Sequence, residues 1–223
     1  MTLLESIDLF PMILTLLAFQ IGRLAQEKWK KPIFNPTLIG MILVVAVLLV
    51  TGMNPAGYTA GMVRLSWLMT PATICLAIPM YEQLELLKKN MKAVMAGIVS
   101  GVIMSLGCIF IMAVIFKLNH QTYVTLLPKS ITTAIGMGVS EELGGYVTIT
   151  VAVIVITGIL GNIIGEAVCK IFRIEEPIAK GVALGTASHA IGTARAMEMG
   201  QIEGAMSSLS IAVAGLLTVA GAT

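Results

Sequence analysis

The feature that most constrains this chain is a series of apolar runs, several of them close to 20 residues long. A helix rises about 1.5 Å per residue, so a run of this length matches the hydrocarbon core of a bilayer. Lipid cannot satisfy free backbone groups, so a spanning segment must be a helix or part of a closed barrel. The runs lack the alternation of apolar and polar residues that is typical of barrel strands. The sequence therefore predicts an all-α integral membrane protein.

Composition narrows the function classes further. Hydrophobic residues make up 57% of the chain and charged residues 12%, against about 25% charged in an average soluble domain. A formal net charge of +2 and 5% aromatic residues offer little to nucleic-acid phosphates or bases, so we expect no nucleic-acid partner. The chain has one aspartate, Asp8, and its two histidines, His120 and His189, form no HExxH motif. We therefore expect neither an enzyme nor a metal or cofactor site.

Hydropathy predicts about six transmembrane helices in a single polytopic domain that covers residues 1–223. Their approximate bounds are residues 7–24, 38–52, 62–81, 94–116, 146–169 and 205 to the C-terminus. The first ten residues lack the basic region and the cleavage site of a secretory signal, so we expect the first run to remain as a span. Pro71 and Pro79 remove backbone donors and are expected to kink or break the third span.

The positions of the basic residues predict an orientation in the membrane. Ten of the fourteen basic residues lie in the connections after the first, third and fifth spans: Arg23, Lys28, Lys30, Lys31, Lys88, Lys89, Lys92, Lys170, Arg173 and Lys180. Basic residues near span ends remain in the cytoplasm, so these connections are predicted to be cytoplasmic. The connection at residues 53–61 has no basic residue, which fits the opposite side. The N-terminus is therefore predicted to lie outside.

Two further segments, residues 126–139 and 181–197, are moderately apolar and dense in Gly, Ser and Thr. A full crossing by the first would place the last basic connection outside, so we predict a re-entrant or broken helical hairpin that enters from the outside. The second is predicted to be the same device entered from the cytoplasm, although the charge rule also allows a full span. Two such hairpins suggest an inverted repeat, in which polar segments meet near the bilayer midplane.

Each polar segment carries a cation, Lys129 in the first and Arg195 in the second. Pro128 suits the first position of a helix, so free N–H groups, helix dipole and the Lys129 ammonium would converge on an anion. A guanidinium can hold a carboxylate through two hydrogen bonds. The predicted substrate-binding residues are Lys129, Ser130, Thr132, Thr133, Ser188, His189, Thr193 and Arg195, with His189 and Glu198 as candidates for proton coupling.

Structural roles remain open for the same residues. Lys129 can extend its ammonium to the membrane interface, and Arg195 can pair with Glu198 three residues further on. A packing role for His189 is as consistent with the sequence as proton transfer. Serine and threonine side chains that bond their own helix would explain many of the hydroxyls.

Four strings in this chain resemble the LrgB/CidB family of bacterial membrane proteins. They are FNPTLIG at residues 34–40, PMYEQL at 79–84, LLPKSITTAI at 126–135 and GTASHAIGTARAMEMG at 185–200. The resemblance covers nearly the whole chain, although Ala134 stands where the family usually has proline. It implies a bacterial cytoplasmic membrane and a small holin-like partner of the LrgA/CidA type.

The resemblance implies two functions. One is an antiholin-like regulator of holin-type pores and murein hydrolases, which needs no substrate of its own. The other is transport of small monocarboxylates such as glycolate, glycerate, lactate or pyruvate. The two polar hairpins favour the second function, a secondary carrier in which Lys129 and Arg195 hold one carboxylate together. The sequence leaves open whether the chain forms a homo-oligomer.

Overall fold

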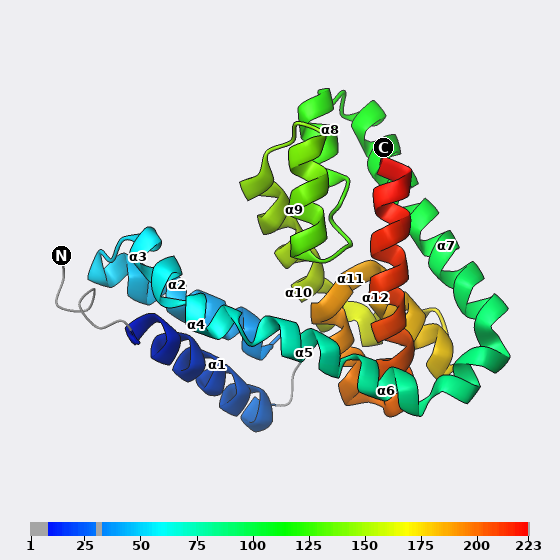
Figure 1. Ribbon diagram of the computed structural model, residues 1–223, viewed down its shortest axis with the longest axis horizontal. Coiled ribbons are helices and arrows are strands. Elements are labelled where there is room, and N and C mark those ends of the chain that lie inside the picture. Colours follow the sequence, from blue (N-terminus) through cyan, green and yellow to red (C-terminus); the bar gives the residue numbers. More distant parts are fainter. Residues whose placement is uncertain (1–8, 30–32, 223) are drawn as a thin grey trace. The chain divides into compact units, whose positions relative to one another are not determined.

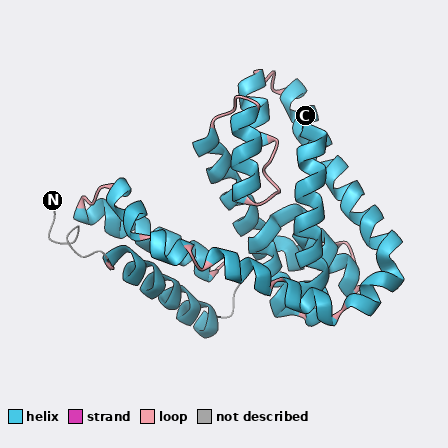
Figure 2. Ribbon diagram, viewed as in Figure 1, coloured by secondary structure: helices cyan, strands magenta, loops and turns pink. Residues whose placement is uncertain are grey.

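The computed structural model describes residues 9–29 and 33–222, and the regular structure in these ranges is helical (Figures 1 and 2). The chain divides into two compact units, Met1–Cys75 and Leu76–Thr223. Four segments in the described ranges are long and apolar enough to cross a membrane: Val63–Glu82, Leu84–Ile115, Val147–Ile171 and Gln201–Ala222. A fifth apolar helix, Pro36–Thr51, is shorter. The chain is therefore a multi-pass helical membrane protein, as its apolar runs predict.

The first unit is built on a pair of helices, α1 (Phe10–Trp29) and α2 (Pro36–Thr51), followed by α3 (Pro55–Gly61), α4 (Val63–Ser66) and α5 (Met69–Cys75). The two long helices pack closely, because a methyl group on Gly22 would lie 2.8 Å from the Cα of Pro36. Asn35 caps α2, since its Oδ1 accepts a hydrogen bond of 3.0 Å from the backbone N–H of Leu38. The start of the predicted first span, Ile7, lies outside the described residues.

The predicted interruption of the third span is confirmed. Its residues form α4, α5 and α6 (Ala77–Glu82), with breaks at residues 67–68 and at residue 76. Proline has no N–H, so Pro71 and Pro79 leave the carbonyls four residues earlier, those of Trp67 and Cys75, without their helical donors. The breaks fall at or next to those carbonyls.

The second unit contains three long helices, α7 (Leu84–Ile115), α10 (Val147–Ile171) and α12 (Gln201–Ala222). Between them lie α8 (His120–Leu126), α9 (Thr133–Glu142) and α11 (Pro177–Met199). Helix α7 starts ten residues before the predicted bound at residue 94, because the Leu, Glu and Lys residues at its start are good helix formers. Lys88, Lys89 and Lys92 therefore lie on its first turns and not in a loop, which corrects the predicted boundary.

Residues 120–142 form a helical hairpin, called here the first hairpin. Helix α8 ends at Leu126 and α9 begins at Thr133, so no continuous helix runs through this segment. The two arms lie side by side: the Thr150 hydroxyl donates a hydrogen bond of 2.8 Å to the Thr125 carbonyl on one arm and lies 2.7 Å from the Ser140 hydroxyl on the other. Residues 127–132, which include Lys129, form the tip. The predicted break is confirmed.

Residues 177–199 form the second hairpin, because α11 is interrupted at its centre. Ser188 and His189 have non-helical backbone angles, and His189 has a φ of 43°. Gly181 and Gly185 of the outgoing arm lie against Glu203 and Ser207 of α12. Thr193 and Met197 of the returning arm lie against Ser207 and Gly204, so the two arms run along the same stretch of α12 in opposite directions. The second polar segment is thus bent back on itself and is not one straight helix.

The two hairpins enter the second unit from opposite ends, and their tips meet beside the middle of α7. Successive contacts along α7 show this order: Phe110 with Tyr123, Ser105 with Ser130, Gly101 with Thr186, and Gly97 with Val182. The first two partners belong to the first hairpin and the last two to the second. Helix α10 repeats the pattern, because Ile154 contacts Gly136 near one tip and Gly158 contacts His189 at the other.

Candidate functional site

A cavity of about 670 Å³ lies where the two hairpin tips approach α7. It is called here the tip cavity. Its walls come from α7, from the tip of the first hairpin and from the outgoing arm of the second, and they include Gly97, Gly101, Ser105, Cys108, Lys129, Ser130, Val182 and Thr186. Glycine is needed on α7 here, because a methyl group on Gly101 would lie 2.7 Å from the Cγ2 of Thr186. The GxxxG spacing of Gly97 and Gly101 thus lets the second hairpin pack closely against α7.

Lys129 is the basic residue that lines this cavity and Glu176 is the acidic one, but the two form no ion pair. Its side chain is half-buried, and its Nζ donates a hydrogen bond of 2.8 Å to the hydroxyl of Ser130. The Ser105 hydroxyl donates to the same oxygen at 3.1 Å, so α7 fixes the position of Ser130. Lys129 forms no ion pair within residues 9–29 and 33–222. An ammonium group held by neutral hydroxyls in a cavity is suited to bind an anion.

Thr186 adds a second polar group to the cavity wall. Its side chain is 5% exposed, and its hydroxyl is the buried side-chain polar atom without a hydrogen-bond partner in the described part of the chain. Buried hydroxyls are nearly always satisfied, so an exception beside a cavity indicates a group that can bond to a ligand or to water.

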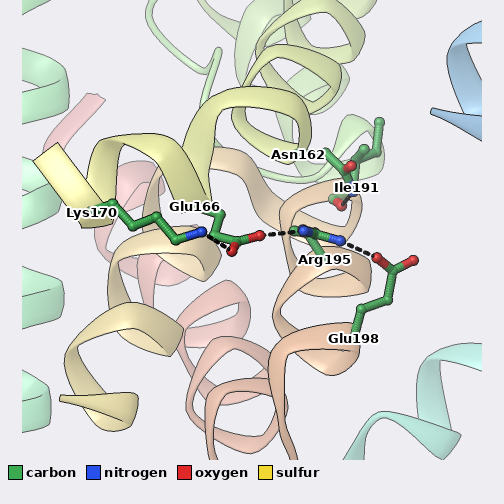
Figure 3. Close-up of polar contacts among 6 residues, drawn as sticks. All are labelled: Asn162, Glu166, Lys170, Ile191, Arg195 and Glu198. Atoms are coloured by element: carbon green, nitrogen blue, oxygen red, sulfur yellow. Dashed lines mark hydrogen bonds and ion pairs between the residues drawn. The ribbon is translucent and has the colours of Figure 1, made fainter. Parts of the chain in front are cut away.

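Arg195 lies in a different place, in a charged network on the returning arm of the second hairpin (Figure 3). Its Nη1 donates a hydrogen bond of 2.6 Å to Glu198, its Nη2 pairs with Glu166 of α10, and Glu166 also accepts from Lys170 at 2.8 Å. These residues line a second cavity of about 490 Å³, called here the charged cavity. The structure therefore does not bring Lys129 and Arg195 to one cavity. The pairing of Arg195 with Glu198, left open by the sequence, is observed.

His189, Thr193 and Ser188 are buried within the second hairpin and its contacts. The Nε2 of His189 lies 3.0 Å from the carbonyl of Ile154, and the Thr193 hydroxyl donates to the carbonyl of His189 at 3.0 Å. Ser188 packs against Gly161 of α10. None of the three is among the residues that line the tip cavity. Their contacts fix the bend of the hairpin, so a structural role is the one that this geometry supports.

Thr132 and Thr133 lie at the start of α9, next to the tip of the first hairpin. Thr132 is the N-cap residue, but its side chain makes no capping hydrogen bond. Both are half-buried and lie outside the lining of the tip cavity. Of the eight predicted binding residues, the structure thus brings Lys129 and Ser130 together in this cavity.

Ser105 and the second partner of Arg195, Glu166, were not predicted from the sequence. Ser105 is one of two serines inside a long apolar run, and Glu166 is 29 residues from Arg195 in sequence. Neither position has a local pattern that indicates its contact. In the described part of the chain, no group of three or more His, Cys, Asp or Glu residues is placed to hold a metal ion.

Comparison with known proteins gives a consistent result. The model of the LrgB-like family matches residues 15–223. Relatives include a holin-like protein CidB of Staphylococcus epidermidis, 36% identical over 92% of this chain and 90% of its own length, and a holin-like protein CidB of Staphylococcus aureus, 36% identical over 94% and 92%. An antiholin-like protein LrgB of Bacillus subtilis is 36% identical over 94% and 91%. No solved structure matches the chain.

Proposed function

The chain belongs to the LrgB-like family, and we propose that it is a secondary carrier of small monocarboxylates such as glycolate, glycerate, lactate or pyruvate. The observation that carries this proposal is Lys129 at a hairpin tip, without an ion pair in the described part of the chain, in a cavity where two hairpins from opposite ends of the unit meet. We place the protein in the cytoplasmic membrane. The distribution of basic residues predicts that its N-terminus lies outside.

Energetics support a ligand at Lys129. A charged side chain at membrane depth costs roughly 2.5–3.5 kcal/mol on insertion scales, and two serine hydroxyls offset only part of that cost. A substrate carboxylate would pair with the ammonium and accept from a serine hydroxyl, while a hydroxyl or keto oxygen of the substrate could bond to Thr186. The carboxylate would thus be held by Lys129, Ser130 and Ser105, in contact with both hairpins.

The hairpins themselves support a carrier. Inverted-repeat carriers place broken helices from the two membrane faces around a substrate site near the midplane, and alternating access moves one bundle against the other. We infer that both hairpins of this chain are re-entrant. Contributions of Thr132, Thr133, Ser188 and Thr193 to binding, and proton coupling by His189 or Glu198, remain predictions.

Uptake into sealed vesicles that contain only the purified protein tests the proposal. Labelled glycolate, lactate or pyruvate should enter along an imposed gradient, and Lys129→Gln should abolish entry. Lys117→Gln is the matched control, because it removes one positive charge from an exposed position near the end of α7. Equal uptake by the parent protein and by Lys129→Gln would remove the proposed role of Lys129.

The names of the relatives favour a second candidate, an antiholin-like or holin-like regulator that acts with a small LrgA/CidA-type membrane protein. In that case the polar segments are contact surfaces for the partner. The same vesicles separate the two candidates. If no labelled monocarboxylate enters with or without the small partner, and the partner's pore activity changes when this chain is added, the regulator is the correct function.

A further inference from the structure

The second hairpin forms a wall of both cavities. Its outgoing arm contributes Val182 and Thr186 to the tip cavity, and its returning arm contributes Arg195 and Glu198 to the charged cavity. A movement of this hairpin would therefore change both cavities together.

The two arms are fixed to their neighbours in different ways. The outgoing arm is held by close packing, because Gly181 and Gly185 lie directly against the backbone of α12. The returning arm packs on Gly204 of α12 through Met197 and on Gly158 of α10 through Ile191, and two polar contacts one helical turn apart add to its hold on α10 (Figure 3). Asn162 donates its side-chain N–H to the carbonyl of Ile191 at 2.8 Å, and Arg195 pairs with Glu166. Helices whose backbones are closely packed lose many contacts when they separate. The polar groups of two hydrogen-bonded contacts can instead bond to water.

The junction between the arms is strained. His189 has a φ of 43°, in the left-handed region that favours glycine, and its ring is held by the carbonyl of Ile154 on α10. Strained residues of this kind persist where the surroundings hold them, and they are found at switch regions. Release of the returning arm from α10 would allow the backbone at residue 189 to relax.

We propose that the Arg195–Glu166 ion pair is a latch that holds the returning arm of the second hairpin against α10, and that its release opens the charged cavity. Arg195 is then a positioning residue and not a ligand of the transported anion. Lys170 is not part of the latch, because it pairs with Glu166 within α10 and its side chain is 76% exposed. Where the carrier proposal holds, this opening is one step of the conformational cycle.

Cys169 provides a native reporter for the latch. It is buried, 4% exposed, and lines the charged cavity with Arg195 and Glu166. In a Cys75→Ser, Cys108→Ser background, Cys169 is the one remaining thiol of the chain. The rate at which a neutral alkylating reagent modifies it, divided by the rate in the unfolded chain, measures how often the charged cavity opens to the reagent.

Arg195→Gln and Glu166→Gln should each raise the labelling rate of Cys169 about tenfold or more, because each removes the charge-assisted contact between the arm and α10. Lys170→Gln is the matched control. It changes the charge near the thiol by the same amount as Arg195→Gln but leaves the latch intact, so its rate should stay within about twofold of the parent. Arg195→Lys keeps the charge without the guanidinium and should give an intermediate rate.

The proposal is overturned if neither glutamine variant labels faster than Lys170→Gln, or if all three label equally fast. Size-exclusion profiles identify a variant that has unfolded, and Arg195→Gln or Arg195→Lys decides the test, because the change of charge in Arg195→Gln is matched by Lys170→Gln. No substrate is used in this experiment. A failure of the latch therefore differs in its readout from a failure of the carrier proposal, which the uptake experiment tests.

Discussion

The cations of the two hairpins in the second unit, Lys129 and Arg195, have different partners. Lys129 at the tip of the first hairpin donates a hydrogen bond to one neutral hydroxyl, that of Ser130, which also accepts from Ser105. Arg195 on the returning arm of the second hairpin is bonded to two carboxylates. A cation that already has two anionic partners gains little from a third, whereas an unpaired one gains a full charge-assisted contact. Lys129 and Arg195 look equivalent in sequence. Lys129 is suited to bind an anion, whereas Arg195 is suited to hold two segments of the chain together.

The largest expected effect is on the affinity for a monocarboxylate, and it tests the difference between Lys129 and Arg195. Lys129→Gln should lower the affinity for a monocarboxylate roughly tenfold to a hundredfold, the loss of a charge-assisted hydrogen bond worth about 1.5–3 kcal/mol. Arg195→Gln should leave the affinity within a few-fold, because Arg195 does not line the tip cavity. Stabilisation of the purified protein against heat by added glycolate or lactate measures both affinities. A larger loss in Arg195→Gln would reverse the roles of the two hairpins.

The second prediction concerns packing of the two hairpins. Gly185→Ala should destabilise the protein by about 1–3 kcal/mol, because the added methyl group collides with the Ser207 backbone of α12. Gly138→Ala in the first hairpin should be neutral or stabilising, because no atom lies within 4 Å of the added methyl group and alanine favours a helix. Melting temperatures in one detergent compare the two variants. Equal stability would show that the outgoing arm is not tightly held by α12.

Thr186→Val tests whether the Thr186 hydroxyl contacts the substrate in the tip cavity, and its expected effect on affinity is smaller than that of Lys129→Gln. It keeps the shape of the side chain but removes the unpaired hydroxyl. The affinity for lactate should fall by about fivefold to tenfold, and that for propionate, which lacks the second oxygen, should not change. The folded state should be at least as stable as that of the parent, since a buried hydroxyl without a partner is removed. Thr186→Ser is the control that retains the hydroxyl. Equal losses for both acids would exclude contact between Thr186 and the second oxygen.

The smallest effect is protection of a native thiol. Cys108 lines the tip cavity, so a saturating monocarboxylate should slow its alkylation about twofold to fivefold by occupying the adjacent space. Cys75 is exposed, belongs to the first unit and should show no protection. Mass spectrometry of the two peptides gives both rates in one sample. Equal slowing of both thiols would indicate a general effect of the anion on the reagent.

Those parts of the fold that depend on local chain chemistry could be predicted from the sequence. Long apolar runs must become helices in lipid, and the breaks beside Pro71 and Pro79 follow from two missing N–H groups. The break after Leu126 followed from counting basic connections. The start of α7 was placed wrongly, because hydropathy locates the edge of the apolar run and not the end of the helix, and charged residues extend the helix by ten residues.

The site was only partly predictable, because its contacts join segments that are far apart in sequence. Lys129 and Ser130 were found from their own segment, where proline, a cation and hydroxyls occur together. Ser105 contacts Ser130 from 25 residues away, and Glu166 contacts Arg195 from 29 residues away. The prediction that Lys129 and Arg195 bind one carboxylate together required the two side chains to lie close together. The sequence does not give the distance between them. A broken hairpin in residues 181–197 was predicted from their Gly, Ser and Thr content, but no proline marks the position of the bend at Ser188 and His189.

Binding of an anion at the tip of the first hairpin is tested by the position of a heavy-atom monocarboxylate in crystals of the protein. A short carboxylic acid with one bromine gives an anomalous difference peak that marks the bound molecule independently of the surrounding density. We expect a peak in the tip cavity, with the carboxylate within hydrogen-bond distance of the Lys129 ammonium, and no such peak in Lys129→Gln. A peak beside Arg195 in the charged cavity, with the tip cavity unoccupied, would contradict this expectation.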